Sequence, residues 1–397
     1  MSKIRVVRTV EIPDLLRISR YRKMPELGPR ILFFSGGSAL NDLCNSLKNY
    51  THNSTHLVTP FDSGGSSAEL RQAFHMPSIG DLRSRLMALA DETVLGHPEV
   101  YELFTYRFPK DASNKELRFR LEEMVQGESS LVADITSPMR RLICNQLGYF
   151  LDAMPASFDL RGASIGNLIL AGGYLNNHQD LDPIIFLFSK LVNVLGTVRI
   201  IVDEDLHLGA DLADGSRVIG QHLLTGKEMA PLSSPIDKLF LSQSCDSLKP
   251  VFPQLRKKSR KLIEAAEMIC YPPGSFYSSL LANLIPDGVG RTIAANDCPK
   301  VYIPNLGSDP EQIGMGFGQM VHALLKQLQA DIPGGCSNDK LLNFVMVDSK
   351  NGHYPSEIPA GLLKELGVEL IDVKLISKQS APFYDNELLV SALLSLT

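Results

Sequence analysis

The chain has 397 residues, a hydrophobic content of 44% and a formal net charge of −5. This length and apolar content support a large buried core, in one α/β domain or in two smaller ones. The acidic balance argues against a general nucleic-acid binder, because such a protein needs a basic face to neutralise phosphates.

Two Gly-Gly-Ser turns follow apolar runs in the first part of the chain. The first lies in RILFFSGGSALNDL from Arg30, and the second lies in VTPFDSGGSSAELR from Val58. Each stretch predicts a short buried strand, a turn of small residues and a helix. Gly36 and Gly64 are 28 residues apart, which fits one βαβ unit. Both turns should therefore lie at the carboxyl edge of one parallel sheet.

These two turns suit an anionic ligand. Glycine permits positive φ and leaves no Cβ in the way, while a following helix offers unpaired N–H groups and partial positive charge. An ordinary tight turn is the alternative for either stretch alone, and neither matches a dinucleotide fingerprint or a P-loop. Asp62 in the second turn adds a carboxylate that can hold a divalent cation against phosphate oxygens.

The segments after the second turn have the apolar periodicity of helices. Residues 80–91 predict a helix, and residues 98–155 contain amphipathic helical segments with no β-branched run between them. We expect a helical insertion at about 98–155 inside a single α/β domain that covers residues 1–397. The inserted helices are too short to bury a core alone, so their apolar faces need the main sheet or a second subunit. A homodimer stays open as the second of these alternatives.

The α/β pattern resumes at residues 164–175 and continues through residues 198–205. Asp214-Gly215 lies between two alternating segments and predicts a hairpin, so we expect an antiparallel portion at the edge of the sheet. The later segments each place an apolar strand before a polar or glycine-rich turn: residues 267–284, 299–307 and 342–349. Residues 384–396 predict a closing helix.

A third turn has the same character as the first two. Residues 271–275 read YPPGS, in which the prolines fix the chain, Gly274 opens the turn and Ser275 is a natural helix N-cap. Alone, this segment predicts a rigid turn with an ordinary cap. Together with the other two turns it predicts one anion site, with Gly36, Gly64 and Gly274 around a cleft at the carboxyl ends of neighbouring strands.

In these segments the sequence resembles the 2-phospho-L-lactate transferase (CofD) family. It is most similar to the bacterial branch, which includes the YvcK-like gluconeogenesis factor that binds UDP-N-acetylglucosamine. The motifs that carry the resemblance occur in order over most of the chain: FFSGGSALNDL, TPFDSGGSSAEL, GDLRSRL, GNLIL, YPPGSFYSSLLANL and PKVYIPNL. The resemblance implies a Rossmann-like, mainly parallel, three-layer α/β/α fold. It also implies a nucleotide diphosphate ligand across the carboxyl ends of the strands.

The resemblance further assigns candidate site residues. Asp62 is the candidate catalytic residue and the ligand of a magnesium ion. The candidate ligand-binding residues are Gly36, Gly37, Ser38, Gly64, Gly65, Ser66, Ser67, Arg83, Gly166, Asn167, Gly274, Ser275, Tyr277 and Asn305. Arg83 is preferred to Arg85 for a diphosphate because the two point to different helix faces and Arg83 follows Gly80-Asp81. A salt bridge from Arg83 to Asp81 or Glu69 is the structural alternative.

Two departures from the family pattern leave the activity open. Ser38-Ala39 stand where Thr-Gly is usual, and Asp62-Ser63 stand where two adjacent aspartates are usual. Losing one carboxylate weakens metal binding and removes a candidate base. One expectation is an enzyme that transfers a phospholactyl-type phosphoryl group to a hydroxyl acceptor. The other is a non-catalytic regulator of carbon or cell-wall metabolism that binds a nucleotide sugar.

The remaining chemistry-bearing residues predict no second site. The six cysteines form no CxxC pair, so we expect reduced thiols and no zinc site. His207, His222 and His353 lack a regular spacing to carboxylates or cysteines, which favours satisfied or surface histidines. The start of the chain lacks an apolar signal core and no run is long enough for a membrane span. We therefore expect a cytoplasmic protein with no membrane or nucleic-acid partner.

Overall fold

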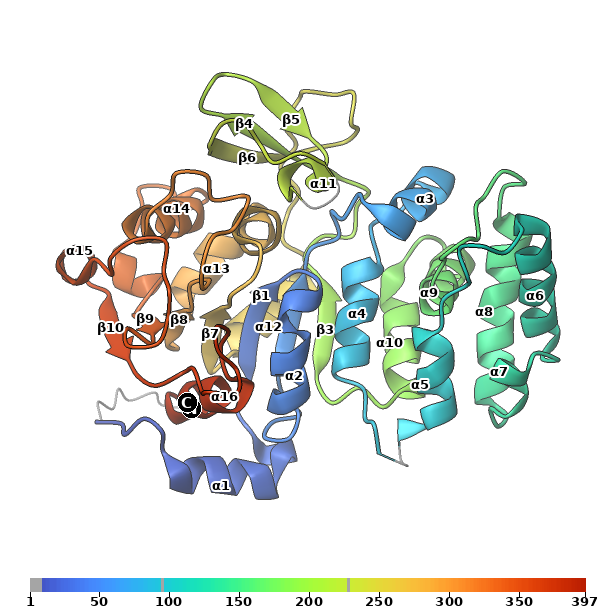
Figure 1. Cartoon of the computed structure of the whole chain (residues 1–397), viewed down its shortest axis with the longest axis horizontal. Coiled ribbons are helices and arrows are strands. Elements are labelled where there is room, and N and C mark those ends of the chain that lie inside the picture. The colour runs from blue at the N-terminus through green and yellow to red at the C-terminus, as the bar shows by residue number, and fades with distance from the viewer. Residues whose placement is uncertain (1–8, 94–95, 227–228) are drawn as a thin grey trace.

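The computed structural model describes residues 9–93, 96–226 and 229–397. A sheet of seven parallel strands lies at the centre of this part of the chain (Figure 1). Across the sheet, the strands are β10 (Glu369–Asp372), β9 (Phe344–Val347), β8 (Lys300–Tyr302), β7 (Met268–Tyr271), β1 (Ile31–Ser35), β2 (Thr55–Val58) and β3 (Thr197–Ile200). The predicted mainly parallel, Rossmann-like sheet is confirmed.

The strand order reverses between β1 and β7. From β1 the chain adds β2 and β3 on one side, and later it adds β7, β8, β9 and β10 on the other side. In the register, Leu32 of β1 lies opposite Thr55 of β2 and Ile269 of β7. Connections leave in opposite directions at such a point, so a crevice is expected outside the carboxyl ends of β1 and β7.

Alternating side chains of the strands enter two apolar layers. In β1, Ile31 and Phe33 join the buried cluster on one face of the sheet, whereas Leu32 and Phe34 join the cluster on the other face. All four side chains are fully buried. A strand buried on both faces reads as a continuous apolar run, which is why the sequence predicts β1 so clearly.

Helices cover both faces of the sheet and make the expected three-layer α/β/α arrangement. The first cluster includes residues of α2 (Asn41–Leu47), α4 (Gly80–Ala88) and α16 (Asn386–Ser395). The second cluster includes residues of α12 (Lys257–Ala265), α13 (Val289–Ala295), α14 (Phe317–Gln329) and α15 (Ala360–Glu365). α1 (Leu15–Lys23) precedes the first strand, and α3 (Gly65–Phe74) follows β2 in the chain. Short turns of helix are η1 (Pro25–Leu27), η2 (Ser38–Leu40), η4 (Phe276–Leu280), η5 (Leu281–Leu284) and η6 (Asn338–Lys340).

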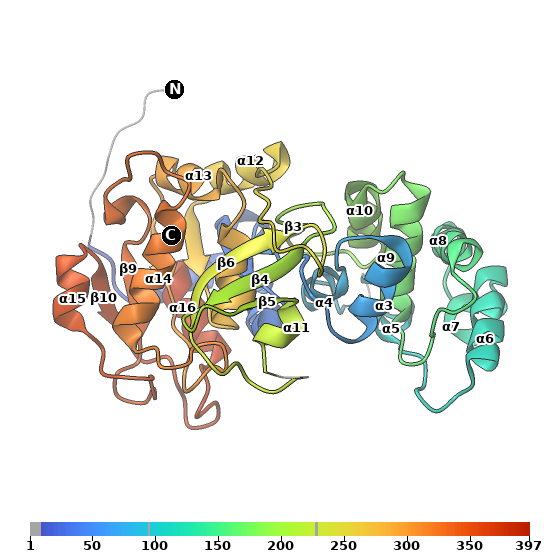
Figure 2. The same ribbon diagram turned by 90° about the horizontal axis from the view of Figure 1, so that it is seen from above.

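A block of six helices lies between β2 and β3 in the chain and extends the first layer sideways. These helices are α5 (Pro98–Thr105), α6 (Asn114–Gln126), α7 (Ser130–Ala133), α8 (Met139–Ala153), α9 (Ile165–Asn176) and α10 (Leu181–Leu191). The expected insertion at about 98–155 is mainly helical, but residues 164–175, where the sequence predicted a return of the α/β pattern, form α9 and α10 follows it. Seen from above, this helical block and α15 lie at opposite ends of the molecule (Figure 2).

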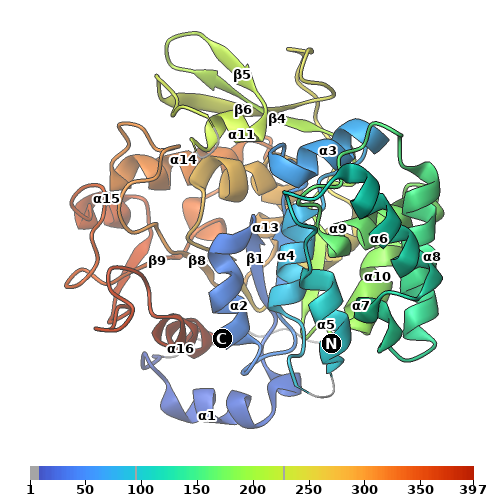
Figure 3. The same cartoon turned by 45° about the vertical axis from the view of Figure 1, so that its right-hand side comes forward.

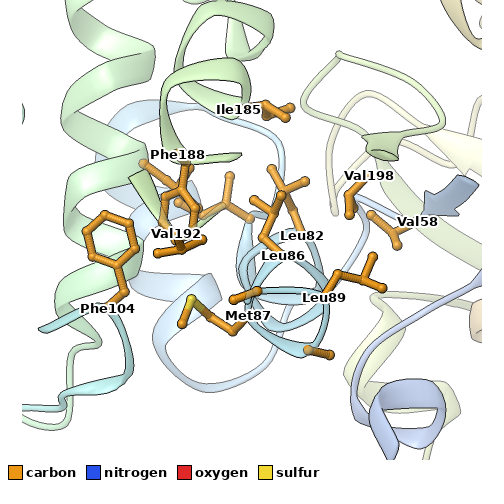
Figure 4. Packing of buried hydrophobic residues seen from close by; sticks show 14 of the residues in the cluster. Val58, Leu82, Leu86, Met87, Leu89, Phe104, Ile185, Phe188, Val192 and Val198 are labelled. Carbon is orange, nitrogen blue, oxygen red and sulfur yellow. The ribbon is translucent and has the colours of Figure 1, made fainter. Parts of the chain in front are cut away.

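The helical block shares its core with the sheet. Leu82 and Leu86 of α4 lie between the strand side chain Val58 and the block side chains Phe104 and Phe188 (Figure 4). All five residues belong to one cluster of buried side chains. The apolar faces of the inserted helices are therefore covered by the body that carries the sheet.

The predicted hairpin forms, but its predicted position is wrong. It belongs to a separate three-stranded antiparallel sheet with β5 (Arg217–Ile219), β4 (His207–Leu212) and β6 (Ile236–Ser242) in this order. The small sheet lies above α3 and α14, over the carboxyl ends of the main strands (Figures 1 and 3). The physical reason is that β4 buries Leu208, Ala210 and Leu212 in the second apolar cluster, so it packs by its face and not by its edge.

Two further observations concern the whole described chain. None of its helices is long and apolar enough to cross a membrane. All six cysteines are free in the structure.

Candidate functional site

A cavity of about 200 Å³ lies at the point where the strand order reverses. Its walls come from residues 36–40 after β1, from Asp62 and Gly64 after β2, and from residues 272–275 after β7. The three predicted turns therefore meet at one cavity, with Gly36, Gly64 and Gly274 all in its lining.

The first turn needs glycine because other groups approach its backbone closely. A Cβ on Gly36 would lie 2.2 Å from Ser279 Oγ, and a Cβ on Gly37 would lie 2.6 Å from Asp81 Oδ1. Neither glycine has a positive φ. Close packing, and not a left-handed backbone, thus explains the Gly-Gly pair in this turn.

The side chain of Arg85 fixes the first turn by hydrogen bonds to its carbonyl groups. Its Nη2 donates hydrogen bonds to the carbonyl oxygens of Gly36 at 3.1 Å and Gly37 at 2.9 Å, and its Nη1 donates to Cys44 Sγ at 2.9 Å. The side chain is fully buried. Arg83, two residues earlier, lines a different cavity, which confirms that the two arginines point to different sides of α4.

The second turn is built around Asp62. Its Oδ1 accepts a hydrogen bond from the backbone N–H of Gly64 at 3.2 Å, and Gly65 then begins α3 with a φ of 45°. The neighbouring Ser63 Oγ lies 2.8 Å from Nδ1 of His222 in α11 (Gln221–Leu224). His222 also lines the cavity, so the sequence argument that set this histidine aside missed a wall residue.

Asp81 supplies a second carboxylate to the site. It lies in the first turn of α4, and both Asp62 and Asp81 line the first cavity and a larger one beside it. Thr59 Oγ1 donates a hydrogen bond to Asp81 Oδ2 at 3.4 Å. Family resemblance pointed to Asp81 only as part of a Gly-Asp-x-Arg segment. In the folded chain, Asp81 lines the same two cavities as Asp62. Its carboxylate therefore lies near the turn in which Ser63 stands where a second aspartate is usual in the family pattern.

The third turn shapes the cavity through its backbone. Gly274 has a φ of 141°, a conformation that favours glycine. The side chain of Asn305 makes two hydrogen bonds to the backbone of Gly274. Its Oδ1 accepts from the N–H of Gly274 at 2.7 Å, and its Nδ2 donates to the Gly274 carbonyl at 2.6 Å. Asn305 is not among the residues that line either of the two adjoining cavities.

The predicted cap by the Ser275 side chain is wrong. Ser275 makes no side-chain hydrogen bond to the helical turn η4, which has π-helical geometry. The N–H groups of Tyr277 and Ser278 instead donate to Glu311 at 2.9 and 2.8 Å, and that of Phe276 donates to Asp309 at 3.1 Å. The carboxylates reach these amides from a distant loop, so the amides after Ser275 are already paired inside the protein.

Burial perturbs two groups behind this turn. Burial, reinforced by the negative charge of Asp309, raises the pKa of Glu311 to about 7. Burial also raises the pKa of Tyr277 to about 12, and the Tyr277 hydroxyl donates to the carbonyl of Ile236 in β6 at 3.2 Å. Tyr277 therefore ties η4 to the small sheet and does not line either adjoining cavity.

A second cavity of about 640 Å³ opens beside the first. The two share Gly37, Ser38, Asp62, Gly64 and Asp81. The predicted residues Gly65, Ser66, Ser67, Arg83 and Asn167 lie in the lining of the second cavity only. Gly166 lies behind them, since a Cβ there would approach the carbonyl oxygen of Phe104 to 2.5 Å and Arg83 Cδ to 2.9 Å.

Sequence reasoning missed three basic residues of the second cavity: Arg107, Lys110 and Arg161. Arg161 precedes Gly162 by one residue and lies just upstream of the Gly166-Asn167 pair, which is the one local signal that pointed there. Arg107 and Lys110 lie in a loop with no recognisable motif, and only the folded chain brings this loop to the site.

The chain matches one known protein family over most of its length. The family model described as 2-phospho-L-lactate transferase CofD matches residues 31–376. The chain belongs to the CofD family. The match includes all the strand-end turns that form the two cavities.

Relatives of this CofD-family chain carry the name gluconeogenesis factor. The Bacillus subtilis protein of that name is 26% identical over 382 residues, which are 93% of this chain and 98% of the relative. The Listeria monocytogenes protein is 27% identical over 363 residues, with 89% and 91% covered. A relative from Nostoc sp. is 29% identical over 324 residues, and the match spans only 56% of its length. These names agree with the bacterial branch expected from the sequence.

A solved structure supports the fold. A member of the UPF0052 family from Bacillus halodurans superimposes with a TM-score of 0.68 at 23% sequence identity, covering 92% of this chain and 99% of that chain. At this identity the likeness concerns the fold. The Rossmann-like arrangement of this CofD-family chain is therefore shared with an experimentally determined structure.

Proposed function

We propose that this CofD-family chain binds a ligand that contains a nucleoside diphosphate, with the diphosphate across the turns after β1 and β2. The observation that carries the proposal is the junction of the two cavities, where Gly37, Ser38 and Gly64 meet the carboxylates of Asp62 and Asp81. Backbone near two helix starts suits phosphate oxygens, and the switch point of an open α/β sheet is where such ligands bind.

The donor set at the junction fits a magnesium ion. Within the described residues no group of three or more His, Cys, Asp or Glu side chains could hold a metal by itself. Mg²⁺ does not require such a group, because it keeps several waters and binds through one or two carboxylates together with ligand phosphates. Asp62 and Asp81 would hold the ion, which would neutralise charge on the diphosphate.

Transfer of a phospholactyl-type phosphoryl group is the reaction that this arrangement supports. The second cavity adjoins the diphosphate turns at Asp62, which leaves room for an acceptor next to the proposed phosphate position. The acceptor oxygen would form the new P–O bond and the nucleoside monophosphate would leave, while Asp62 would take the proton of the acceptor hydroxyl and the turn amides would stabilise charge on the phosphates. Positioning and electrostatics would supply most of the rate enhancement, as in other phosphoryl transfers.

A regulator that binds a nucleotide sugar is the second candidate, and one contact favours it. The bond between Ser63 and His222 joins the second turn to α11, and α11 leads into the small antiparallel sheet above the cleft. A ligand that moves the second turn would move α11 with it. The small sheet would then change position when the cleft holds a ligand, and a partner protein that binds this sheet would respond to the change.

Calorimetry and phosphorus NMR test these proposals in two steps. Titration of GDP and of UDP, each with magnesium and with chelator, should show binding of one nucleotide that is stronger with the ion. Absence of binding by both nucleotides under both conditions contradicts the proposed ligand. For the bound nucleotide, a phospholactyl adduct incubated with a deazaflavin hydroxyl acceptor should give new ³¹P signals if the chain is a transferase. An unchanged spectrum with tight binding supports the regulator.

A further inference from the structure

The second cavity has a basic wall that the helical block supplies. Arg83 enters it from α4, Arg107 and Lys110 come from the loop between α5 and α6, and Arg161 comes from the segment before α9. Ser66 and Ser67 of α3 also line this cavity. Segments between the helices of the block thus contribute most of the positive charge in this cavity, whose lining also includes the carboxylates of Asp62, Glu69, Asp81 and Asp159.

Among the described residues, three of these cations form no ion pair with a carboxylate. Arg161 forms an ion pair with Asp159 at 2.7 Å. Arg83, Arg107 and Lys110 form no ion pair within the described part of the chain. Arg107 Nη1 donates to the carbonyl of Gly162 at 3.2 Å, which leaves the rest of its guanidinium donors for other partners.

Arg107 is exposed, and it places a second positive charge near the largely buried Arg83. Burial and, as a smaller cause, the positive charge of Arg107 together lower the pKa of Arg83 to about 10. The Nε atom of Arg83 is buried and has no hydrogen-bond partner in the described chain. Like charges next to an unpaired buried donor are stabilised when an anion lies between them.

An unpaired buried hydroxyl at the start of α9 also suggests an anionic ligand in the second cavity. Ser164 precedes this helix and Asn167 lies in its first turn, and both line the second cavity. Ser164 Oγ is buried and has no partner among the described residues, and Ser164 is 0% exposed. A buried hydroxyl without a partner costs free energy, so this atom is explained by a ligand that accepts its hydrogen bond.

We propose that the second cavity is an anion subsite in which Arg83, Arg107 and Lys110 bind a phosphate or carboxylate group beyond the diphosphate. This inference rests on the proposed function and narrows its ligand. The anionic group belongs either to the far end of the nucleotide ligand or to a separate second substrate.

The decisive variant removes the charge that the helical block contributes. Arg107→Gln/Lys110→Gln keeps hydrogen-bonding side chains but removes two positive charges from the cavity. Arg118→Gln/Arg120→Gln is the matched control, since it removes two charges from α6 of the same block at residues paired with Glu122 and Glu116. Neither control residue lines either adjoining cavity.

Two calorimetric arms distinguish the sources of the anion. In the first, UDP-glucuronate should bind the wild type about tenfold more tightly than UDP-glucose, a difference that one charge-assisted contact can supply. In the second, inorganic phosphate should bind the protein in the presence of saturating UDP or GDP if the anion comes from a separate molecule. The Arg107→Gln/Lys110→Gln variant should lose whichever effect is seen and should keep its affinity for the nucleoside diphosphate, and the control variant should keep both.

The outcomes separate this inference from the proposed function. Equal affinities for the two nucleotide sugars together with no phosphate binding overturn the anion subsite, even if UDP or GDP binds well. An anion effect that persists in the cavity variant also overturns it. Failure of both UDP and GDP to bind overturns the proposed function alone, because phosphate binding to the nucleotide-free protein and its loss in the cavity variant still decide the subsite.

Discussion

The buried guanidinium of Arg85 donates a hydrogen bond of 2.9 Å to the carbonyl oxygen of Gly37. The same Nη2 atom bonds the carbonyl of Gly36, and Nη1 bonds the sulfur of Cys44. The turn after β1 therefore has its carbonyl groups fixed to the inside of the protein. Its opposite side is left to face the cavity.

Replacement of Arg85 should therefore damage both stability and the site. A lysine has one nitrogen in place of two donors at different positions, so Arg85→Lys leaves a turn carbonyl or Cys44 without its partner. The expected loss in the free energy of unfolding is about 2–4 kcal/mol. Urea unfolding measures it, with Arg83→Lys as the control because Arg83 faces the second cavity. An equal small effect of both substitutions would show that Arg85 does not support the turn.

The contact between Gly36 and Ser279 gives a second prediction. A Cβ on Gly36 would lie 2.2 Å from Ser279 Oγ and 2.7 Å from Ser279 Cβ, so Gly36→Ala should destabilise the protein by roughly 2 kcal/mol through overpacking. Ser279→Gly removes both opposing atoms and should restore part of the loss. A double-mutant cycle by urea unfolding measures this compensation. Additive effects of the two substitutions would contradict the packing explanation.

Glu311 makes the stability depend on pH. Its pKa is raised to about 7, whereas an unfolded chain would have a value near 4.3. The folded state thus holds the proton more tightly, and the associated stability is full at low pH and is lost as the pH rises through 7. Relative to Glu311→Gln, the wild type should lose roughly 1–3 kcal/mol between pH 5 and pH 8.

Urea unfolding of both proteins at pH 5, 6, 7 and 8 measures this difference. Glu357→Gln is a suitable control because Glu357 is exposed. A constant difference between the wild type and Glu311→Gln over this range would show that Glu311 keeps an ordinary pKa.

The bond between Ser63 and His222 predicts a coupling in ligand binding. Both His222→Ala and Ser63→Ala break the 2.8 Å contact that holds α11 against the second turn. Each should weaken binding of the nucleoside diphosphate by about three- to tenfold, and the double variant should be no worse than the worse single variant. Calorimetry on the four proteins gives the coupling. Fully additive losses would mean that each side chain acts alone.

The first half of the site could be predicted because its signals are local. β1 (ILFFS) is almost entirely apolar and is followed at once by its Gly-Gly pair, whereas β2 (THLV) is only partly apolar and precedes its Gly-Gly pair by five residues. The spacing between Gly36 and Gly64 then implies one βαβ unit, which places both turns at the same edge of the sheet. Local pattern and topology together were enough to predict that these turns would meet.

The other half depends on contacts between distant segments. The amides after Ser275 look available in the sequence, yet Glu311 and Asp309 reach them from a loop more than 30 residues later. Arg107 and Lys110 likewise reach the second cavity from a loop without periodicity. No spacing rule encodes such contacts, because they follow from how the helical block packs on α4. The small sheet was misplaced for the same reason.

Asp62→Asn tests the central claim most directly. Asp214→Asn is the matched control, because Asp214 also accepts from the N–H group two residues later, in the β4–β5 hairpin away from the site. Titration of GDP and UDP into the wild type and both variants, with magnesium and with chelator, is the measurement. If Asp62 holds the ion against the diphosphate, Asp62→Asn should weaken binding at least about tenfold with magnesium and little without it, since the amide keeps the turn but lacks the charge. An equal small loss with and without magnesium, matched by Asp214→Asn, would contradict a metal-bound diphosphate at this junction.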